Sequence, residues 1–210
     1  MSTPMPAAER FRLLNALGLL AVGAVLVAAF VDQIAFNDLP CPLCILQRAG
    51  FLGVAAGLAL NVKFGPRPSH YGVMLLSALA GGAVSMRQTL LHIIPGEGAY
   101  GDAFFGLHFY AWALILFIVC IAGTAVLLLF DRQFEPPGTA PVRRRGLLPF
   151  GAVTIVLALL LALANGGSTV IECGGGLCPD NPTSYRLIDD GTIDALFGPV
   201  LGPLRDLVGR

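Results

Sequence analysis

The stretch LPCPLCILQRAGFLGVAAGLALNV, residues 39–62, decides the class of protein to which this chain belongs. From Cys44 to Val62 it is apolar over nearly the length of about 20 residues that a membrane-spanning helix needs. A Cys-x-x-Cys motif, Cys41 to Cys44, stands at its start, and Arg48 follows one helical turn later. An arginine inside a membrane span is costly and needs a partner or a polar ligand. The stretch therefore predicts a membrane helix with chemistry at one end.

The composition of the whole chain agrees with a membrane protein. Of its 210 residues, 56% are hydrophobic and only 12% are charged, whereas a soluble domain carries roughly a quarter of charged residues. Such a chain cannot cover an aqueous surface, so most of it must face lipid. The formal net charge of zero argues against a nucleic-acid partner.

Five apolar runs are long enough to cross a membrane, so we expect an all-α polytopic bundle. The runs are residues 13–31, 44–62, 71–94, 107–130 and 147–164. The first exceeds the h-region of a signal peptide and no clear small-residue cleavage site follows it, so we expect it to remain as a span. Residues 1–165 would form the bundle, and residues 166–210 a C-terminal tail.

The charges in the connections set the expected orientation. The cations that gather on one side are Arg10, Arg12, Lys63, Arg67, Arg132 and Arg143–Arg145. The acids that gather on the other side include Asp32, Asp38, Glu97, Asp102 and Glu172. The positive-inside rule therefore places the N-terminus in the cytoplasm and the C-terminus outside.

Four of the five cysteines fall on the outer side as two close pairs, Cys41 with Cys44 and Cys173 with Cys178. Disulfides form and persist in that compartment. Cys120 lies within an apolar span, and we expect it to be a packing residue.

The first pair has the features of a reactive dithiol. Cys-x-x-Cys motifs commonly favour the thiolate, and Cys44 falls near a helix N-terminus, whose partial positive charge does the same. Arg48 is four residues after Cys44 and shares its helix face, with Gln47 beside it. Three alternatives stay open: a disulfide that braces a loop, a zinc site made by the four outer cysteines, and an Arg48 that only extends its charge to the interface.

The second pair lies in CGGGLC, residues 173–178. Its three glycines make a flexible ring, which suits a disulfide that is attacked, opened and passed on. A structural disulfide that caps an exposed loop is the competing interpretation.

The segments CPLCILQRAGF (41–51) and MRQTLLHIIP (86–95), in this order of spans, resemble the bacterial DsbB family, the disulfide bond formation protein B. The resemblance covers roughly residues 10–130. It implies a four-helix inner-membrane oxidoreductase that reoxidises a periplasmic thioredoxin-fold thiol oxidase, DsbA, and passes the electrons to a membrane quinone, ubiquinone or menaquinone. It also implies that Cys41 and Cys44 are the quinone-coupled pair, with Arg48 and Gln47 near the quinone. Arg87 and His92 match more loosely as quinone surroundings.

The chain departs from the family in its second cysteine pair. The family carries that pair in the outer loop between spans three and four, but this loop has no cysteine here, and a fifth span presents Cys173 and Cys178 instead. We therefore expect a DsbB-like four-helix core plus a fifth helix, with the tail pair facing the partner. The rival functions are a vitamin K epoxide reductase-like enzyme, an outward-reducing transporter, and a membrane protein that binds metal through the outer cysteines.

Two further patterns concern the outer side. Aromatic residues gather around the loop between spans three and four, where we expect an interface belt, with quinone docking as the alternative and His108 undecided; they are Tyr100, Phe104, Phe105, Phe109, Tyr110 and Trp112. Apolar residues between Ile193 and Val208 recur at spacings of three and four, which indicates either a segment resting on the outer leaflet or a disordered tail.

Overall fold

The computed structural model describes residues 6–36, 38–93, 98–101, 103–135, 149–174 and 176–189. The long helices are α1 (Ala7–Ala35), α2 (Pro42–Phe64), α3 (Pro68–Leu91), α4 (Phe109–Leu128) and α5 (Pro149–Cys173). The short elements are strands β1 (Ala103–Phe104) and β2 (Leu107–His108), the 3-10 helix η1 (Asp131–Gln133) and helix α6 (Arg186–Asp189). All five long helices are long and apolar enough to cross a membrane. The expected all-α polytopic bundle is confirmed.

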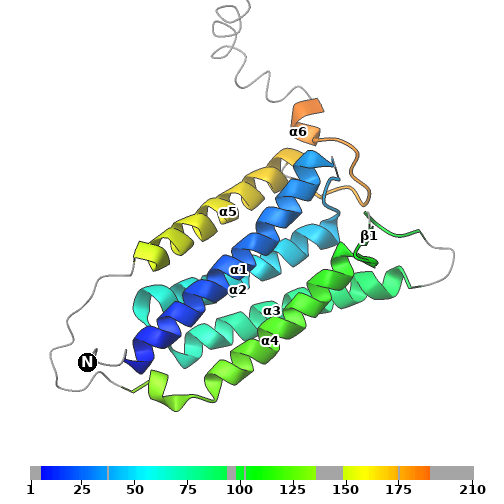
Figure 1. Cartoon of the computed structure of the whole chain (residues 1–210). Coiled ribbons are helices and arrows are strands. Elements are labelled where there is room, and N and C mark those ends of the chain that lie inside the picture. The colour runs from blue at the N-terminus through cyan, green and yellow to red at the C-terminus, as the bar shows by residue number, and fades with distance from the viewer. Residues whose placement is uncertain are drawn as a thin grey trace, which may run out of the picture.

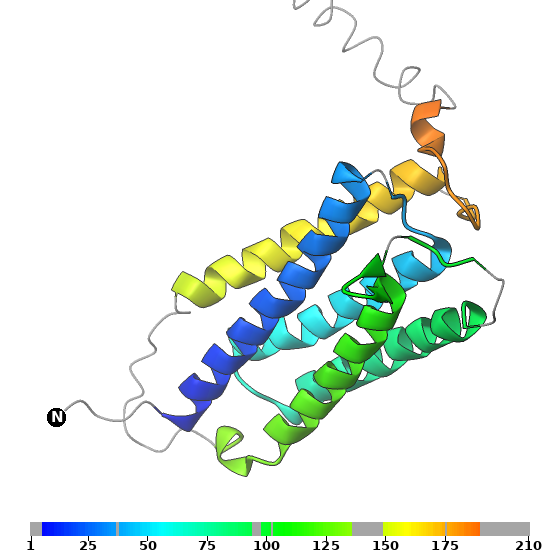
Figure 2. The same ribbon diagram turned by 45° about the vertical axis from the view of Figure 1, so that its right-hand side comes forward.

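The bundle is built around α2 (Figures 1 and 2). Helix α2 packs on α1 and on α3, and α4 packs on α3. Helix α5 lies along α1 and α2, on the side of the bundle away from α4. The fifth helix therefore packs on one side of the four-helix core, to which it contributes Leu161.

Glycines let α2 and α3 approach closely. A Cβ atom added at Gly50 would lie 2.8 Å from the Cα atom of Gly81, and one at Gly57 would lie 2.7 Å from the carbonyl oxygen of His70. Phe117 of α4 covers Gly81 and stacks on Phe51, with ring centroids 4.1 Å apart. Small residues of this kind allow membrane helices to pack backbone against backbone.

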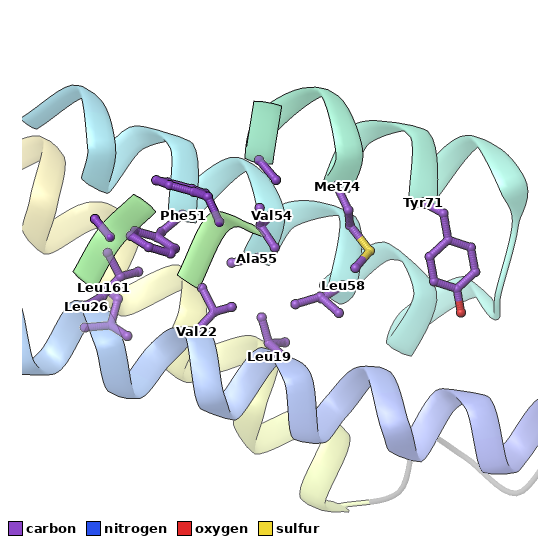
Figure 3. Close-up of a cluster of buried hydrophobic side chains, with 13 residues drawn as sticks. Leu19, Val22, Leu26, Phe51, Val54, Ala55, Leu58, Tyr71, Met74 and Leu161 are labelled. Carbon is purple, nitrogen blue, oxygen red and sulfur yellow. The ribbon is translucent and has the colours of Figure 1, made fainter. Parts of the chain in front are cut away.

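The apolar core joins α1 to this pair of helices. Figure 3 shows Leu19, Val22 and Leu26 of α1 directed toward α2, which meets them with Val54 and Leu58. Each of these five side chains is buried. The core fixes the relative positions of α1 and α2, on which the site described below depends.

The end of the bundle remote from the cysteines is joined by buried polar groups. Asn61 Nδ2 donates to Asn15 Oδ1 (2.9 Å), and Asn15 Nδ2 donates to Tyr71 Oη (3.0 Å). Tyr71 Oη in turn donates to Gln133 Oε1 (2.7 Å). This chain of hydrogen bonds links α1, α2, α3 and η1, so the polar groups do not remain unsatisfied in the bundle.

The fifth helix is longer than the sequence predicts. We expected its span to end at residue 164, but α5 continues to Cys173. The polar residues that suggested an end are accommodated within the helix: Asn165 Nδ2 donates to the Leu161 carbonyl (2.8 Å), and Thr169 Oγ1 donates to the Asn165 carbonyl (2.9 Å). The helix ends at Gly174, whose φ of +66° is the left-handed conformation typical of a glycine after a helix. Helix α5 therefore extends nine residues beyond the expected end of the span.

The first four expected spans match α1 to α4, with differences of several residues at the ends. The basic run at 143–145 and the apolar pattern from Ile193 to Val208 lie outside the described residues.

Candidate redox site

A disulfide between Cys41 and Cys44, here called the cavity pair, stands at the start of α2, with Cα atoms 5.0 Å apart. Cys41 is the N-cap residue, and its sulfur accepts a hydrogen bond from the Cys44 backbone N–H (3.2 Å). Pro42 is the first helical residue, a position where its missing N–H costs nothing. Cys44 thus lies in the first turn of α2, as the sequence predicts, where the helix dipole favours a thiolate.

Arg48 is held by α1. Its Nη1 atom donates to Gln33 Oε1 (2.7 Å), its Nη2 atom donates to the Ala29 carbonyl (2.9 Å), and its guanidinium lies 5.4 Å from the centroid of the Phe30 ring. Within the described residues its hydrogen-bond partners are therefore on α1, and the Cys44 sulfur is not one of them. The charge is thus held by hydrogen bonds within the protein, and Arg48 lines the same cavity as Cys44.

Gln33 connects this arginine to the fifth helix and the tail. While its Oε1 atom accepts from Arg48, its Nε2 atom donates to Ser168 Oγ of α5 (2.8 Å) and to Tyr185 Oη of the tail (2.9 Å). The residue is 2% exposed. One buried amide therefore joins α1, α2, α5 and the tail.

Gln88 of α3 provides the polar contact of the cavity pair. Its Nε2 atom lies 3.4 Å from Cys41 Sγ and 3.6 Å from Cys44 Sγ, and its Oε1 atom accepts a hydrogen bond from Gln47 Nε2 (2.7 Å). Both glutamines are buried. Gln47 thereby orients Gln88, and Gln88 presents an N–H donor to both sulfurs.

A cavity of about 450 Å³ opens beside Cys44 and Arg48. Its polar lining comes from Gln47, Arg48 and Gln88 and from the acids Asp32 and Asp38. All six aromatic residues of the loop region line it: Tyr100, Phe104, Phe105, Phe109, Tyr110 and Trp112. Its size and its mainly apolar lining with a few polar groups are typical of small-molecule sites.

The loop over the cavity is fixed by its own hydrogen bonds. Tyr100 Oη donates to the Leu39 carbonyl, and Trp112 Nε1 donates to the Phe104 carbonyl (2.8 Å). Burial, with Asp38 and Glu172 nearby, raises the pKa of Tyr100 to about 12. Tyr100 therefore keeps its proton and its bond to the residue that leads into the cavity pair.

The second disulfide, here called the tail pair, joins Cys173 to Cys178, with Cα atoms 4.5 Å apart. Cys173 is the last residue of α5 and is buried, whereas Cys178 is half-buried. Arg186 Nη1 donates to the Leu177 carbonyl (3.2 Å), which holds α6 against this loop. Both cysteine pairings expected from the sequence are confirmed, and a zinc site from these four residues would need thiolates rather than two disulfides.

The remaining candidates are placed as follows. Arg87 is exposed on α3, and His92 is half-buried, with its Nδ1–H directed at the Gln88 carbonyl (2.8 Å) and its ring stacked on Tyr110. Neither lines the cavity formed by the described residues. His108 likewise stacks on Tyr110, and Cys120 packs at the edge of the apolar core.

Sequence reasoning missed the roles of Gln33 and Gln88. Gln88 stands in the second half of the apolar run at 71–94, where a polar residue usually faces the bundle interior. Gln33 lies just beyond the run at 13–31 and gives no such signal. For both residues the sequence does not identify the partner, because the partner comes from another helix.

Comparison of the sequence with known proteins finds relatives for the part of the chain that contains the cavity pair. Residues 11–100 match the family model described as disulfide bond formation protein DsbB. The chain is 43% identical over 89 residues to a disulfide bond formation protein B of Aromatoleum aromaticum, covering 40% of this chain and 53% of that protein. It is 39% identical over 106 residues to a disulfide bond formation protein B 2 of Burkholderia lata, covering 49% and 62%.

The chain spans about half the length of the curated relatives it matches. No solved structure matches it. The matched residues include the cavity pair, Arg48, Gln47 and Gln88, while α4, α5 and the tail pair lie beyond the family match. Residues 11–100, with the first cysteine pair at the start of the second membrane helix, are thus similar to the DsbB family.

Proposed function

We propose that the protein is a quinone-linked thiol–disulfide oxidoreductase of the bacterial inner membrane, which reoxidises a periplasmic DsbA-like thioredoxin-fold protein. The observation that carries the proposal is that Cys44 of a disulfide and the cation Arg48 line one cavity. The charge distribution supports a cytoplasmic N-terminus and a periplasmic C-terminus, so that both cysteine pairs face the periplasm.

The cavity fits a membrane quinone, either ubiquinone or menaquinone. Aromatic side chains such as Phe104 and Trp112 offer flat apolar surface, and Arg48 and Gln47 offer hydrogen-bond donors at the polar side. When bound, a quinone supplies an acceptor for two electrons and two protons. Arg48 is suited to hold a carbonyl oxygen on which negative charge develops, because its charge is already oriented by Gln33 and Ala29.

The tail pair is the entry point for the partner. Cys178 is more exposed than Cys173, so a partner thiolate attacks the Cys178 sulfur, forms a mixed disulfide and releases Cys173 as a thiolate. The second thiol of the partner then attacks its own half of the mixed disulfide. The partner leaves oxidised, and Cys173 and Cys178 stay reduced with the two electrons.

The same exchange moves the electrons to the cavity pair. The reduced tail pair attacks the Cys41–Cys44 disulfide, re-forms its own S–S bond and leaves Cys41 and Cys44 as the dithiol. Gln88 and the N-terminus of α2 stabilise negative charge on these sulfurs. Cys44, which lines the cavity, is the sulfur from which the electrons leave.

The test is turnover by the purified protein with a reduced DsbA-type partner and a soluble quinone, monitored by oxidation of the partner and by quinone absorbance. We expect Cys44→Ser and Cys173→Ser each to abolish turnover, while Cys120→Ser, which alters the packing cysteine, retains it. Loss in Cys44→Ser alone would show that the partner attacks the cavity pair directly. Full turnover in Cys44→Ser would refute the proposal.

A further inference from the structure

Glu172 is a buried acid that the exchange steps do not use. It precedes Cys173 at the end of α5, its side chain is 0% exposed, and neither carboxylate oxygen has a hydrogen-bond partner among the described residues. A buried carboxyl group without partners is costly, and such exceptions in a folded protein call for an explanation.

The position of Glu172 is set by the contacts of its helix. Ser168, one turn earlier on the same face of α5, accepts a hydrogen bond from Gln33, which also holds Arg48. Glu172 interacts electrostatically with Arg48, although the guanidinium donates its hydrogen bonds to Gln33 and Ala29. The acid therefore precedes a cysteine of the tail pair in the chain and interacts with the arginine that lines the cavity.

The charged group that interacts with Glu172 from α2 is Arg48. The other ionisable groups that interact with Arg48 or Glu172 are Asp32 on α1, Asp38 before α2, Tyr100 in the loop over the cavity and Tyr185 in the tail. Because neither oxygen of Glu172 has a hydrogen-bond partner among the described residues, no such bond has to break when the carboxyl group takes up or releases a proton.

The proposed function creates a need for such a group. Oxidation of the cavity dithiol forms one S–S bond and releases two electrons and two protons, and the acceptor in the cavity must gain two of each. Electrons pass directly between sulfur and acceptor, but the protons need a carrier in a region lined mainly by apolar and aromatic side chains.

We propose that Glu172 is the proton-relay residue between the tail side of the protein and the cavity, acting beside Arg48. The inference rests on the proposed function and extends it to a residue of the fifth helix. Glu172 takes up a proton near Cys173 and gives it up on the side of Arg48. A carboxylate that only pairs with Arg48 for structural reasons would stay ionised during reduction and oxidation of the cysteine pairs.

The first test needs no quinone. Infrared difference spectra of the purified, quinone-free protein are recorded across pH, with the cysteine pairs oxidised and then reduced. We expect a carbonyl band of a protonated carboxylic acid that changes with pH and with reduction, that is absent in Glu172→Gln, and that is retained in Asp180→Asn, which removes an exposed acid of the tail. A band that is missing, or that changes under no condition, would overturn the relay.

The second test separates the steps. We expect Glu172→Gln to leave oxidation of the partner in a quinone-free single turnover within about threefold of wild type, and to slow quinone reduction by about a hundredfold, the contribution typical of proton transfer. The remaining rate should fall as pH rises, and Glu172→Asp should restore much of it. Equal rates of quinone reduction for Glu172→Gln and wild type at every pH would overturn the inference. An inactive wild type would refute the proposed function. In that case the infrared result still decides whether Glu172 exchanges protons.

Discussion

At the scale of single residues, the cavity pair owes its environment to neutral amides. Gln88 reaches both sulfurs, and Gln33 fixes the arginine next to them. Neither amide carries a charge, so both can be buried in a membrane bundle at a lower cost than an ionised group. Their effect should appear in the redox properties of the pair.

Replacing Gln88 by leucine removes the donor that faces Cys41 and Cys44. Such a donor stabilises the reduced sulfurs, once ionised, more than the disulfide. A hydrogen bond to a charged group contributes about 1.5–3 kcal/mol, so we expect the reduction potential of the pair to become about 30 to 60 mV more negative. Equilibration with thiol redox buffers in detergent measures this potential. Thr89→Val is the matched control, because the hydrogen bond of its hydroxyl within the described residues goes to the Ser85 carbonyl of the same helix. An equal shift in both variants would contradict the role of Gln88.

The raised pKa of Tyr100 predicts how the stability of the protein changes with pH. The pKa of Tyr100 is raised from 10.0 to about 12 in the folded protein. Between about pH 10 and pH 12 the folded protein therefore keeps the Tyr100 proton, whereas the unfolded chain has lost it. This contribution to stability is complete below about pH 10 and is lost as pH rises through 12. Thermal unfolding in detergent should therefore show a loss of stability above pH 10 that is smaller in Tyr100→Phe. Parallel losses in the two proteins would assign the effect to another group.

The site could be predicted from the sequence only where chemistry narrows the choice. Few explanations fit an arginine within a membrane span next to a cysteine pair. The sequence therefore predicted that Cys44 and Arg48 share a face near the start of a helix, and in the structure both lie on α2 and line one cavity. Gln33 and Gln88 gave no such signal, because a neutral amide is tolerated in a span and its partner comes from a helix distant in sequence.

At the scale of elements, glycines determine how closely α2 and α3 pack. We expect Gly57→Ala to lower the free energy of unfolding by about 1–3 kcal/mol, because the new Cβ atom would meet the backbone carbonyl of His70. Gly72→Ala is the control: no atom lies within 4 Å of its added Cβ, and alanine is the better helix former by about 1 kcal/mol. Unfolding in mixed micelles measures both, and equal stability of the two variants would contradict the close packing at Gly57.

The ends of the helices were harder to predict from the sequence than their positions in the chain. Apolar length alone located all five spans, because a bilayer demands it. The end of α5 was misplaced because Asn165 and Thr169 resemble the polar residues that follow a helix. In the structure their side chains bond to carbonyls one turn earlier, an option that the sequence pattern does not distinguish from a loop.

At the scale of the whole molecule, the orientation in the membrane decides which compartment the cysteines meet. Alkaline phosphatase, which is active only outside the cytoplasm, should be active when fused after Asp189 and inactive when fused after Glu135. The reason is the excess of Lys and Arg in the connections on the Glu135 side. A fluorescent protein that folds only in the cytoplasm should give the opposite pattern, and a reversal of both would overturn the assignment of the redox site to the periplasm.

The continuation of α5 to Cys173 has a kinetic consequence. A cysteine at the end of a packed helix is held in place by the bundle, whereas one on a long free loop is not. In the proposed exchange, its effective concentration at the cavity pair is therefore set by the bundle itself. Tethered groups of this kind commonly reach effective concentrations in the millimolar range. Small thiols dissolved in the periplasm would have to approach that level before they could compete for the Cys41–Cys44 disulfide. Under the exchange proposed above, the fifth helix would thus insulate the electron path of the protein from the general thiol pool.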